Sequence, residues 1–221
     1  MDKKKLYSHV DHTLLKATAT WVQIQQLCDE ALKYGTASVC IPPCYIKRVK
    51  EKYGASLNIC TVVGFPLGYS VTESKVLETS QAIKDGASEV DMVINISDVK
   101  NGDYGKICDE IKAIKTAAGG NILKVIIETC YLTEHEKIEM CNAVTQAGAD
   151  YIKTSTGFGT AGATMEDVLI LKKHIGKNVK IKAAGGVKTA EDMENFINAG
   201  CDRIGTSSAV AILSGQDATG Y

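Results

Sequence analysis

The sequence has no excess of charge of either sign, few aromatic residues and no long apolar run. Of its 221 residues, 25 are Lys or Arg and 26 are Asp or Glu, for a formal net charge of −1. A nearly neutral chain gives no sign of a nucleic acid or an anionic membrane as a partner, so any anion-binding site must be local. No apolar stretch approaches the length of a membrane span. We therefore expect neither nucleic acid nor a membrane as a partner.

The cysteines form no C-x-x-C pair, and most occur in segments with apolar periodicity. They are Cys28, Cys40, Cys44, Cys60, Cys108, Cys130, Cys141 and Cys201. No signal-peptide-like apolar segment follows the N-terminal MDKKK. We expect a cytoplasmic protein with buried free thiols.

The histidines make a poor metal set. His135 and His174 fall in expected helices, far from strand ends, and only His9 and His12 remain. A zinc site needs three or four convergent ligands. We therefore expect no metal and reject a metal-dependent chemistry.

Helical patterns alternate with short apolar strands along the whole chain. Ile24, Leu27, Cys28 and Ala31 recur at helical spacing before Gly35. The expected strands are SVCI near 39, ICTVV near 61, VDMVI near 92, KVII near 125, YIK near 152, KIKAA near 182, DRIG near 204, and a weaker candidate from Val10 to Leu14. Apolar strands between helices indicate a parallel sheet covered on both faces. Because the sequence contains no segment with the composition of a linker, we expect one domain over 1–221, with a short flexible tail from about 214.

An internal repeat indicates how that sheet is arranged. Four segments begin with a helix-ending glycine and carry a distinctive residue five positions later. These distinctive residues are Cys40, Asp91, Lys153 and Gly205, on the second, fourth, sixth and eighth expected strands. Alternate strands of an eight-stranded barrel contribute to one interior layer. An open doubly wound sheet does not predict a distinctive residue at the same position of every second strand. We therefore expect a single (β/α)8 TIM barrel of the α/β class.

Three lysines lie in or beside consecutive strands. Lys124, Lys153 and Lys182 are each separated by 29 residues, about one β-α unit. A single such lysine usually extends its amine to water at a strand end. Three would converge on the barrel axis, where burial and like-charge repulsion favour a neutral, nucleophilic amine. The arrangement suits imine chemistry, although the residues alone do not choose among the three lysines.

Two acidic residues lie in the same expected strands. Asp91 interrupts the apolar run EVDMVI, which a buried strand tolerates only if the carboxylate is paired. Lys124 on the neighbouring strand is the expected partner, and proton transfer is a compatible role for the same carboxylate. Asp11, in VDHTLL, is either a second site residue or a turn cap. Cys40 either lines the site or is a small core residue.

Glycine and serine clusters follow the last three strands. They read Thr154-Ser-Thr-Gly-Phe-Gly-Thr-Ala-Gly162, Ala184-Gly-Gly-Val187 and Gly205-Thr-Ser-Ser-Ala209. Small residues let backbone N–H groups approach an anion, and barrels often bind phosphate after strands 7 and 8. Tight turns also need glycine, but the position favours phosphate binding.

Eight motifs spread along the chain carry a family resemblance. The motifs DHTLL, VCIPPCY, VVGFPLG, EVDMVINI, KVIIETCYL, YIKTSTGF, KAAGGVKTAED and GTSSA occur in this order. Together they resemble bacterial deoxyribose-phosphate aldolases, from about Asp11 to Ser208 and on to the C-terminal tyrosine. The resemblance implies a cofactor-free (β/α)8 aldolase that cleaves 2-deoxy-D-ribose 5-phosphate to D-glyceraldehyde 3-phosphate and acetaldehyde. It also implies a homodimer or another homo-oligomer.

The resemblance further implies roles for single residues. Lys153 would form the Schiff base, Lys182 would depress its pKa, and Asp91 paired with Lys124 would relay protons. Tyr221 would help exchange the enamine proton. The implied phosphate contacts are Gly157, Gly185, Gly186, Gly205, Ser207 and Ser208. We also expect Asp11, Cys40 and Thr154 to contact the substrate or its phosphate. Phe158 and Lys188 stand where some family members carry a basic residue and Arg, respectively.

Three other functions fit parts of the pattern. Another lysine-imine aldolase or a transaldolase could use the same barrel. A pyridoxal-phosphate barrel also needs a lysine and a phosphate cradle. A non-catalytic phosphosugar-binding barrel has no need of three convergent lysines.

Overall fold

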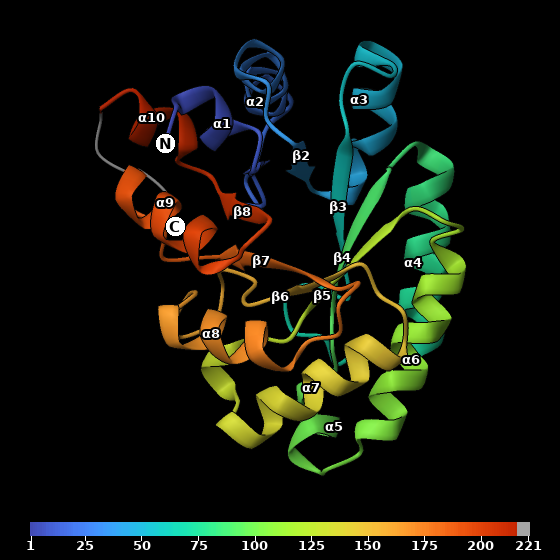
Figure 1. Ribbon diagram of the computed structural model, residues 1–221. Coiled ribbons are helices and arrows are strands. Elements are labelled where there is room, and N and C mark those ends of the chain that lie inside the picture. Colours follow the sequence, from blue (N-terminus) through green and yellow to red (C-terminus); the bar gives the residue numbers. More distant parts are fainter. Residues whose placement is uncertain (216–221) are drawn as a thin grey trace.

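The computed structural model describes residues 1–215, and eight parallel strands close into a barrel within that range. Each strand pairs with the next along the chain, and the last pairs with the first (Figure 1). The strands are β1 (Val10–Thr13), β2 (Ser38–Ile41), β3 (Ile59–Val63), β4 (Glu89–Val93), β5 (Ile122–Ile126), β6 (Tyr151–Lys153), β7 (Lys180–Ala184) and β8 (Arg203–Thr206). The expected (β/α)8 barrel and all eight of its strands are confirmed, and the doubly wound alternative is wrong.

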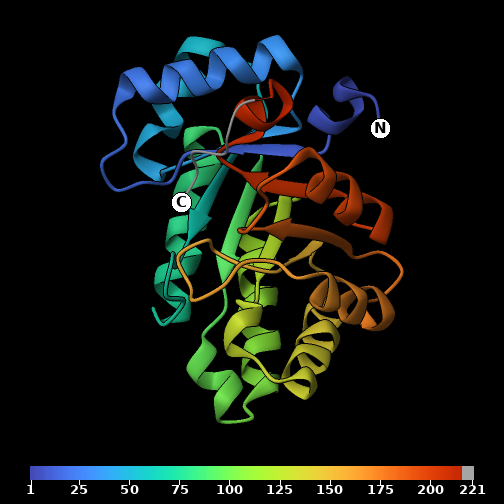
Figure 2. The same ribbon diagram turned by 90° about the vertical axis from the view of Figure 1, so that its left-hand side faces the viewer.

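Helices surround the barrel (Figures 1 and 2). The α-helices are α1 (Lys3–Tyr7), α2 (Trp21–Tyr34), α3 (Ile46–Tyr53), α4 (Thr72–Asp85), α5 (Ile96–Lys100), α6 (Tyr104–Ala117), α7 (Glu134–Gln146), α8 (Met165–His174), α9 (Ala190–Ala199) and α10 (Ala209–Leu213). Two 3-10 turns, η1 (Pro43–Tyr45) and η2 (Thr129–Tyr131), follow β2 and β5. Of the helices in residues 1–215, none is long and apolar enough to cross a membrane.

Local sequence explains why these helices begin and end where they do. Thr20 and Gln23 form a capping box at the start of α2. The buried face of α2 carries the four apolar residues expected from the periodicity, and Gly35 ends it in a left-handed conformation, with φ of 70°. Thr133 and Thr189 cap α7 and α9 in the same way as Thr20 caps α2. Short-range chemistry therefore sets the lengths of the elements.

The interior of the barrel is polar, whereas its outer face packs apolar side chains against the helices. Val90, Met92, Leu123 and Val125 belong to the main apolar core, between β4, β5 and their covering helices. Residues alternate along each strand, so the side chains between these positions face the barrel axis. Asp91 and Lys124 occupy such positions and are paired in register across β4 and β5. The four distinctive residues of the repeat also lie inside the barrel: Cys40 and Lys153 approach Asp91, and Gly205 faces Lys182.

The two ends of the described chain lie side by side. Helix α10 lies next to α1 in both views (Figures 1 and 2). The α1 residue Tyr7 stacks on Tyr34 of α2, with ring centroids 4.8 Å apart. The expected tail from about 214 falls almost entirely outside the described residues, so it stays a prediction.

Candidate active site

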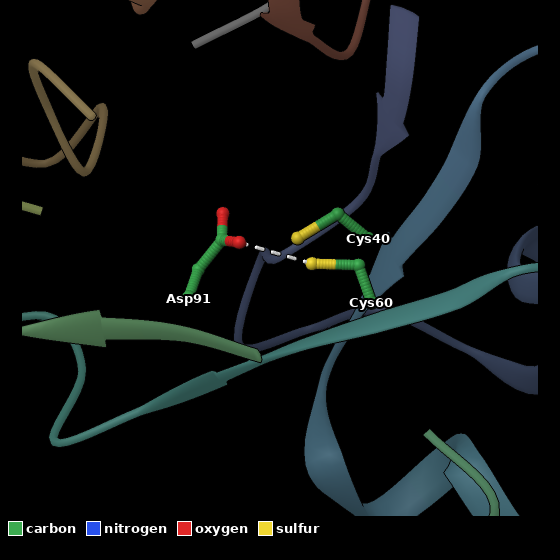
Figure 3. Close-up of side chains that lie close together, drawn as sticks. All are labelled: Cys40, Cys60 and Asp91. Atoms are coloured by element: carbon green, nitrogen blue, oxygen red, sulfur yellow. Dashed lines mark hydrogen bonds between the residues drawn. The ribbon is translucent and has the colours of Figure 1, made fainter. Parts of the chain in front are cut away.

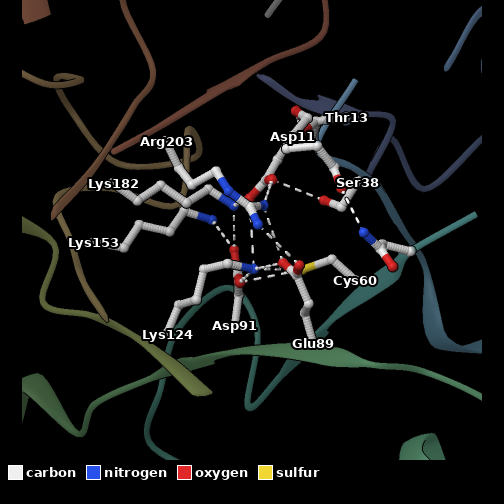
Figure 4. A network of polar contacts seen from close by, with 12 residues as sticks. Asp11, Thr13, Ser38, Cys60, Glu89, Asp91, Lys124, Lys153, Lys182 and Arg203 are labelled. Carbon is white, nitrogen blue, oxygen red and sulfur yellow. Dashed lines mark hydrogen bonds and ion pairs between the residues drawn. The ribbon is translucent and has the colours of Figure 1, made fainter. Parts of the chain in front are cut away.

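A cluster of charged side chains fills the barrel interior (Figure 4). We call it the charge cluster, and its members are Asp11, Glu89, Asp91, Lys124, Lys153, Lys182 and Arg203. Six strands contribute, and Asp91 lies at the centre. One carboxylate oxygen of Asp91 accepts from Lys124 at 2.9 Å, which confirms the expected pair. The other accepts from both Lys153 and Lys182, each at 2.7 Å.

Two further carboxylates complete the cluster beneath Asp91. Asp11 lies 2.5 Å from the Lys182 amine, and Glu89 lies 2.5 Å from the Lys124 amine. Arg203 pairs with both Asp11 and Glu89. Asp11 is therefore a member of the cluster and not merely a turn cap. Because every carboxylate has cationic partners, the cluster satisfies the requirement that buried charges be paired.

The electrostatics of the cluster overturn one expectation. Burial alone would lower the pKa of Lys182, but the charges of Asp11 and Asp91 raise it above its ordinary value. Burial would likewise lower the pKa of Lys124, and the carboxylates again raise it well above its ordinary range. The expectation that burial and repulsion make these amines neutral is wrong for Lys124 and Lys182. Sequence pattern revealed the lysines but not the number of carboxylates between them.

The carboxylates respond in the opposite direction. Burial would raise the pKa of Asp91, but the surrounding lysines hold it well below its ordinary range. Asp11 behaves in the same way, because Lys124, Lys182 and Arg203 outweigh its burial. Both groups are therefore carboxylates at neutral pH, and they act as hydrogen-bond acceptors.

Two buried thiols border the cluster on β2 and β3 (Figure 3). Cys60 donates to Asp91 at 3.1 Å, and the Lys124 amine approaches the Cys60 sulfur at 3.2 Å. Burial raises the pKa of Cys60 well above its ordinary value, so it remains a thiol. The ligand atoms of Cys40, Cys60 and Asp91 lie within 4.8 Å of one another. Lysine ammonium groups already occupy both oxygens of Asp91, so these residues are poorly arranged for a cation.

A pocket of about 500 Å³ opens above the cluster, at the carboxyl ends of the strands. We call it the rim pocket. It is lined by Thr13, Leu15, Lys153, Thr156, Gly157, Ala184, Gly185, Gly186, Val187, Lys188, Thr189, Gly205, Thr206, Ser207 and Ser208. All six expected phosphate contacts are therefore in one place, together with Lys188. Lys153 is the lysine of the three that reaches the pocket, whereas Lys124 and Lys182 are fully buried beneath it.

The glycines of the rim pocket have backbone conformations that other residues rarely adopt. Gly185 and Gly186 have φ of 76° and 73°. A side chain on Gly185 would also begin 3.0 Å from the backbone of Gly162. The two loops therefore approach closely because both carry glycine. Such loops can present backbone N–H groups to an anion.

Several expected contacts lie below the rim pocket and do not line it. Cys40 and Asp11 are fully buried in the barrel. Thr154 is buried as well, and its hydroxyl accepts from the Ala184 N–H at 3.1 Å. Phe158 also stands outside the lining, where its ring packs edge-on against Phe65 at 5.3 Å between centroids. Tyr221 lies outside the described residues, so its role stays a prediction.

Sequence reasoning missed four residues of this site. Glu89 and Arg203 are charged residues within strand patterns, EVD and DRIG, so the signal that revealed Asp91 was available for them too. Cys60 lies in an apolar run and resembles a core residue. Glu128 follows β5, lies outside every expected strand and accepts at 3.1 Å from the backbone N–H of Thr156, which lines the rim pocket. Only the folded chain brings Cys60 and Glu128 to the site.

Comparison with known proteins agrees with this geometry. Residues 5–215 match the DeoC/LacD family aldolase. The chain belongs to this aldolase family. A relative from Clostridium botulinum (strain Alaska E43 / Type E3), named deoxyribose-phosphate aldolase, is 66% identical over 221 residues and covers 100% of both chains. A protein of the same name from Clostridioides difficile (strain 630) is 60% identical over 218 residues, 99% of this chain and 100% of the relative.

A solved structure shares the fold of this aldolase. Deoxyribose phosphate aldolase from Aeropyrum pernix, described as tetrameric, superposes with a TM-score of 0.87 at 31% identity. The match covers 97% of this chain and 92% of that chain. Family membership and barrel architecture are thus supported over nearly the whole length.

Proposed function

We propose that this protein is a deoxyribose-phosphate aldolase that cleaves 2-deoxy-D-ribose 5-phosphate through a lysine Schiff base. The observation that carries the proposal is the position of Lys153. Its amine lies between the charge cluster, where it bonds to Asp91 at 2.7 Å, and the rim pocket, which it lines. A substrate whose phosphate binds among the rim glycines and serines can therefore bring its aldehyde to one lysine. The names of the close relatives support the same substrate.

In the proposed mechanism, the Lys153 amine attacks the aldehyde of the open-chain sugar and water leaves. The resulting protonated imine keeps a positive charge beside the Asp91 carboxylate, which stabilises it. The imine withdraws electrons, so the bond between C2 and C3 breaks as the C3 hydroxyl gives up its proton. The Asp91 carboxylate, through a water molecule, would take that proton, and the charged amine of Lys182 beside it would assist the transfer. Glyceraldehyde 3-phosphate leaves, and the remaining enamine is protonated and hydrolysed to acetaldehyde.

Lys182 and Lys124 have supporting roles in this proposal. Lys182 and Lys153 share one oxygen of Asp91, so their nitrogens are no further apart than twice 2.7 Å. The raised pKa of Lys182 keeps it charged at that position. Lys124 holds the second oxygen of Asp91 and so fixes the orientation of the carboxylate. No organic cofactor is required for any of these steps.

The test is to trap the imine. The protein is mixed with 2-deoxyribose 5-phosphate, reduced with borohydride and digested, and the modified peptide is identified by mass spectrometry. We expect a two-carbon or sugar-phosphate adduct on Lys153 and none in Lys153→Ala. An adduct on Lys124 or Lys182 instead would overturn the assignment of the nucleophile. Absence of any adduct on the folded wild-type protein would overturn the aldolase mechanism.

We also propose a homo-oligomer, since the Aeropyrum pernix relative is described as tetrameric. Light scattering of the purified protein would give its mass. A monomer at micromolar concentration would contradict this proposal.

A further inference from the structure

Glu128, two residues after the end of β5, has an unusual backbone conformation. Among residues 1–215 it is the one non-glycine residue with positive φ, at 50°. Its side chain is nevertheless buried, with 2% exposed. A left-handed conformation costs free energy in residues other than glycine and persists where the surroundings hold it. A buried carboxylate also needs partners. Both costs call for an explanation.

The carboxylate of Glu128 binds one residue of the loop after β6. It accepts the backbone N–H of Thr156 at 3.1 Å, and the Thr156 hydroxyl donates to it as well. The Thr156 oxygen in turn accepts the N–H of Phe158 at 3.0 Å. Glu128 therefore orients the Thr156 hydroxyl, and this hydroxyl closes a turn over Gly157. We call residues 156–158 the Gly157 turn.

The Gly157 turn is part of the rim pocket. Thr156 and Gly157 both line it, and Gly157 has φ of 90°. In the part of the chain that the structure describes, no backbone carbonyl accepts from the Gly157 N–H. This group is therefore suited to bind an anion in the pocket.

The residues on either side of Glu128 hold the nucleophile's strand. Ile127 N–H donates to the Lys153 carbonyl at 3.0 Å, and Thr129 N–H donates to the Thr154 carbonyl at 2.9 Å. Gly159 lies close to the carboxylate, since a Cβ atom at this position would lie 3.1 Å from Glu128 Cδ. Backbone bonds thus fix Lys153, whereas the carboxylate of Glu128 fixes the Gly157 turn.

We propose that Glu128 is a positioning residue that sets the selectivity of this site for phosphorylated substrates. It does so by holding the Gly157 turn at a fixed place relative to the Lys153 amine. This inference rests on the proposed function, in which the rim pocket binds the substrate's phosphate. Removing the carboxylate should therefore weaken phosphate binding while imine formation is retained, because the sheet bonds of β6 do not depend on it.

The experiment compares Glu128→Ala and Thr156→Val, which remove the two ends of the same hydrogen bond, with Glu128→Gln, whose amide oxygen can still accept. Calorimetry gives the affinity for inorganic phosphate. Kinetics give the ratio of kcat/KM for 2-deoxyribose 5-phosphate to that for 2-deoxyribose. We expect Glu128→Ala and Thr156→Val each to lower the phosphate affinity and this ratio about tenfold. Glu128→Gln should recover most of both, and borohydride trapping of acetaldehyde should match wild type.

Glu110→Gln is the matched control, because Glu110 is another buried glutamate and pairs with Lys75 on α4 at 2.9 Å. It should alter stability without altering phosphate affinity. Wild-type phosphate affinity in both Glu128→Ala and Thr156→Val would overturn the inference, as would an equal loss of acetaldehyde trapping. If Glu128→Ala does not fold, Thr156→Val decides the question. Failure of the proposed function would look different: wild type would form no imine, and phosphate affinity would still report on Glu128.

Discussion

The charge cluster and the rim pocket lie next to each other and are built in opposite ways. The cluster consists of charged side chains from six strands, held by the parallel register of the barrel. The rim pocket consists largely of backbone and small side chains from the loops after β6, β7 and β8. Lys153 belongs to both. In the proposed function, reactivity therefore depends on side chains of the strands, and recognition of the substrate depends on the loops. Changes in the cluster should alter kcat, and changes at the rim should alter KM.

The largest effect is expected from Lys182→Ala. The change removes a charged group that bonds Asp91 and Asp11 and leaves both carboxylates short of a partner. Proton transfer by positioned groups contributes about 10²- to 10⁴-fold, so kcat should fall by that order while KM changes little. Steady-state kinetics measure both. Lys180→Ala, at an exposed position on the same strand, is the control and should behave like wild type. A rise in KM alone would contradict the division between cluster and rim.

A second prediction concerns acid denaturation. The pKa values of Asp11 and Asp91 are lowered in the folded protein, so both take up protons less readily there than in the unfolded chain. Their contribution to stability is present above the unfolded pKa of about 3.9 and is lost as pH falls toward the folded values. Below pH 4, each of the two carboxylates should lower the free energy of unfolding by up to about 1.4 kcal/mol per pH unit. Urea denaturation between pH 3 and pH 7 measures this.

The raised pKa of Lys182 acts at the other end of the scale. The stability that Lys182 contributes is present below the pKa of about 10.4 that lysine has in the unfolded chain. It is lost only as pH rises through the higher pKa of Lys182 in the folded protein. We therefore expect no loss from Lys182 up to pH 9. Ser208→Ala, a rim change, should leave the whole profile unaltered. An equally steep loss of stability in acid in a variant without the Asp11 carboxylate would show that Asp11 is not a source of this loss.

A smaller effect is expected at the rim from Lys188→Ala. Lys188 lines the pocket and is exposed to solvent, so its attraction for a phosphate is weakened by water and salt. We expect KM for the phosphorylated sugar to rise about fivefold at low salt, with kcat unchanged and the difference reduced at high salt. Kinetics at two ionic strengths test this. Lys177→Ala, at an exposed position beyond α8, is the control. A fall in kcat would contradict this prediction, because it would mean that Lys188 acts on the chemical step, as the residues of the charge cluster do.

The smallest effect is expected from Cys60→Ala. A thiol is a weak donor, and the bond from Cys60 to Asp91 is one of several that hold this carboxylate. We expect kcat to fall about threefold, and Cys60→Ser to recover it because a hydroxyl can donate in place of the thiol. Cys141→Ala, which removes an equally buried thiol from α7, controls for packing. Equal kinetics in Cys60→Ala and Cys141→Ala would mean that Cys60 only fills space.

Particular residues show which parts of the site could be predicted. Asp91 was identified because a carboxylate in an apolar strand needs a partner, and its register with Lys124 follows from adjacent parallel strands. Sequence pattern could not show that Lys182 remains charged, since this depends on Asp11, more than 170 positions earlier in the chain. Glu128 was missed because its hydrogen bond to Thr156 and its positive φ arise only where the loops after β5 and β6 meet.

The sequence by itself determined the elements and their order, because capping residues, helix-ending glycines and apolar strands act over a few neighbours. It also determined that lysines and carboxylates would face one interior, since alternation along a strand has a strict period of two. Only the tertiary structure decided which lysine meets the pocket. Closure of the barrel places Lys153 at its upper edge and buries Lys124 and Lys182 below. How deep a side chain lies along the barrel axis depends on how all the strands are staggered, and the residues next to it in the sequence do not determine this.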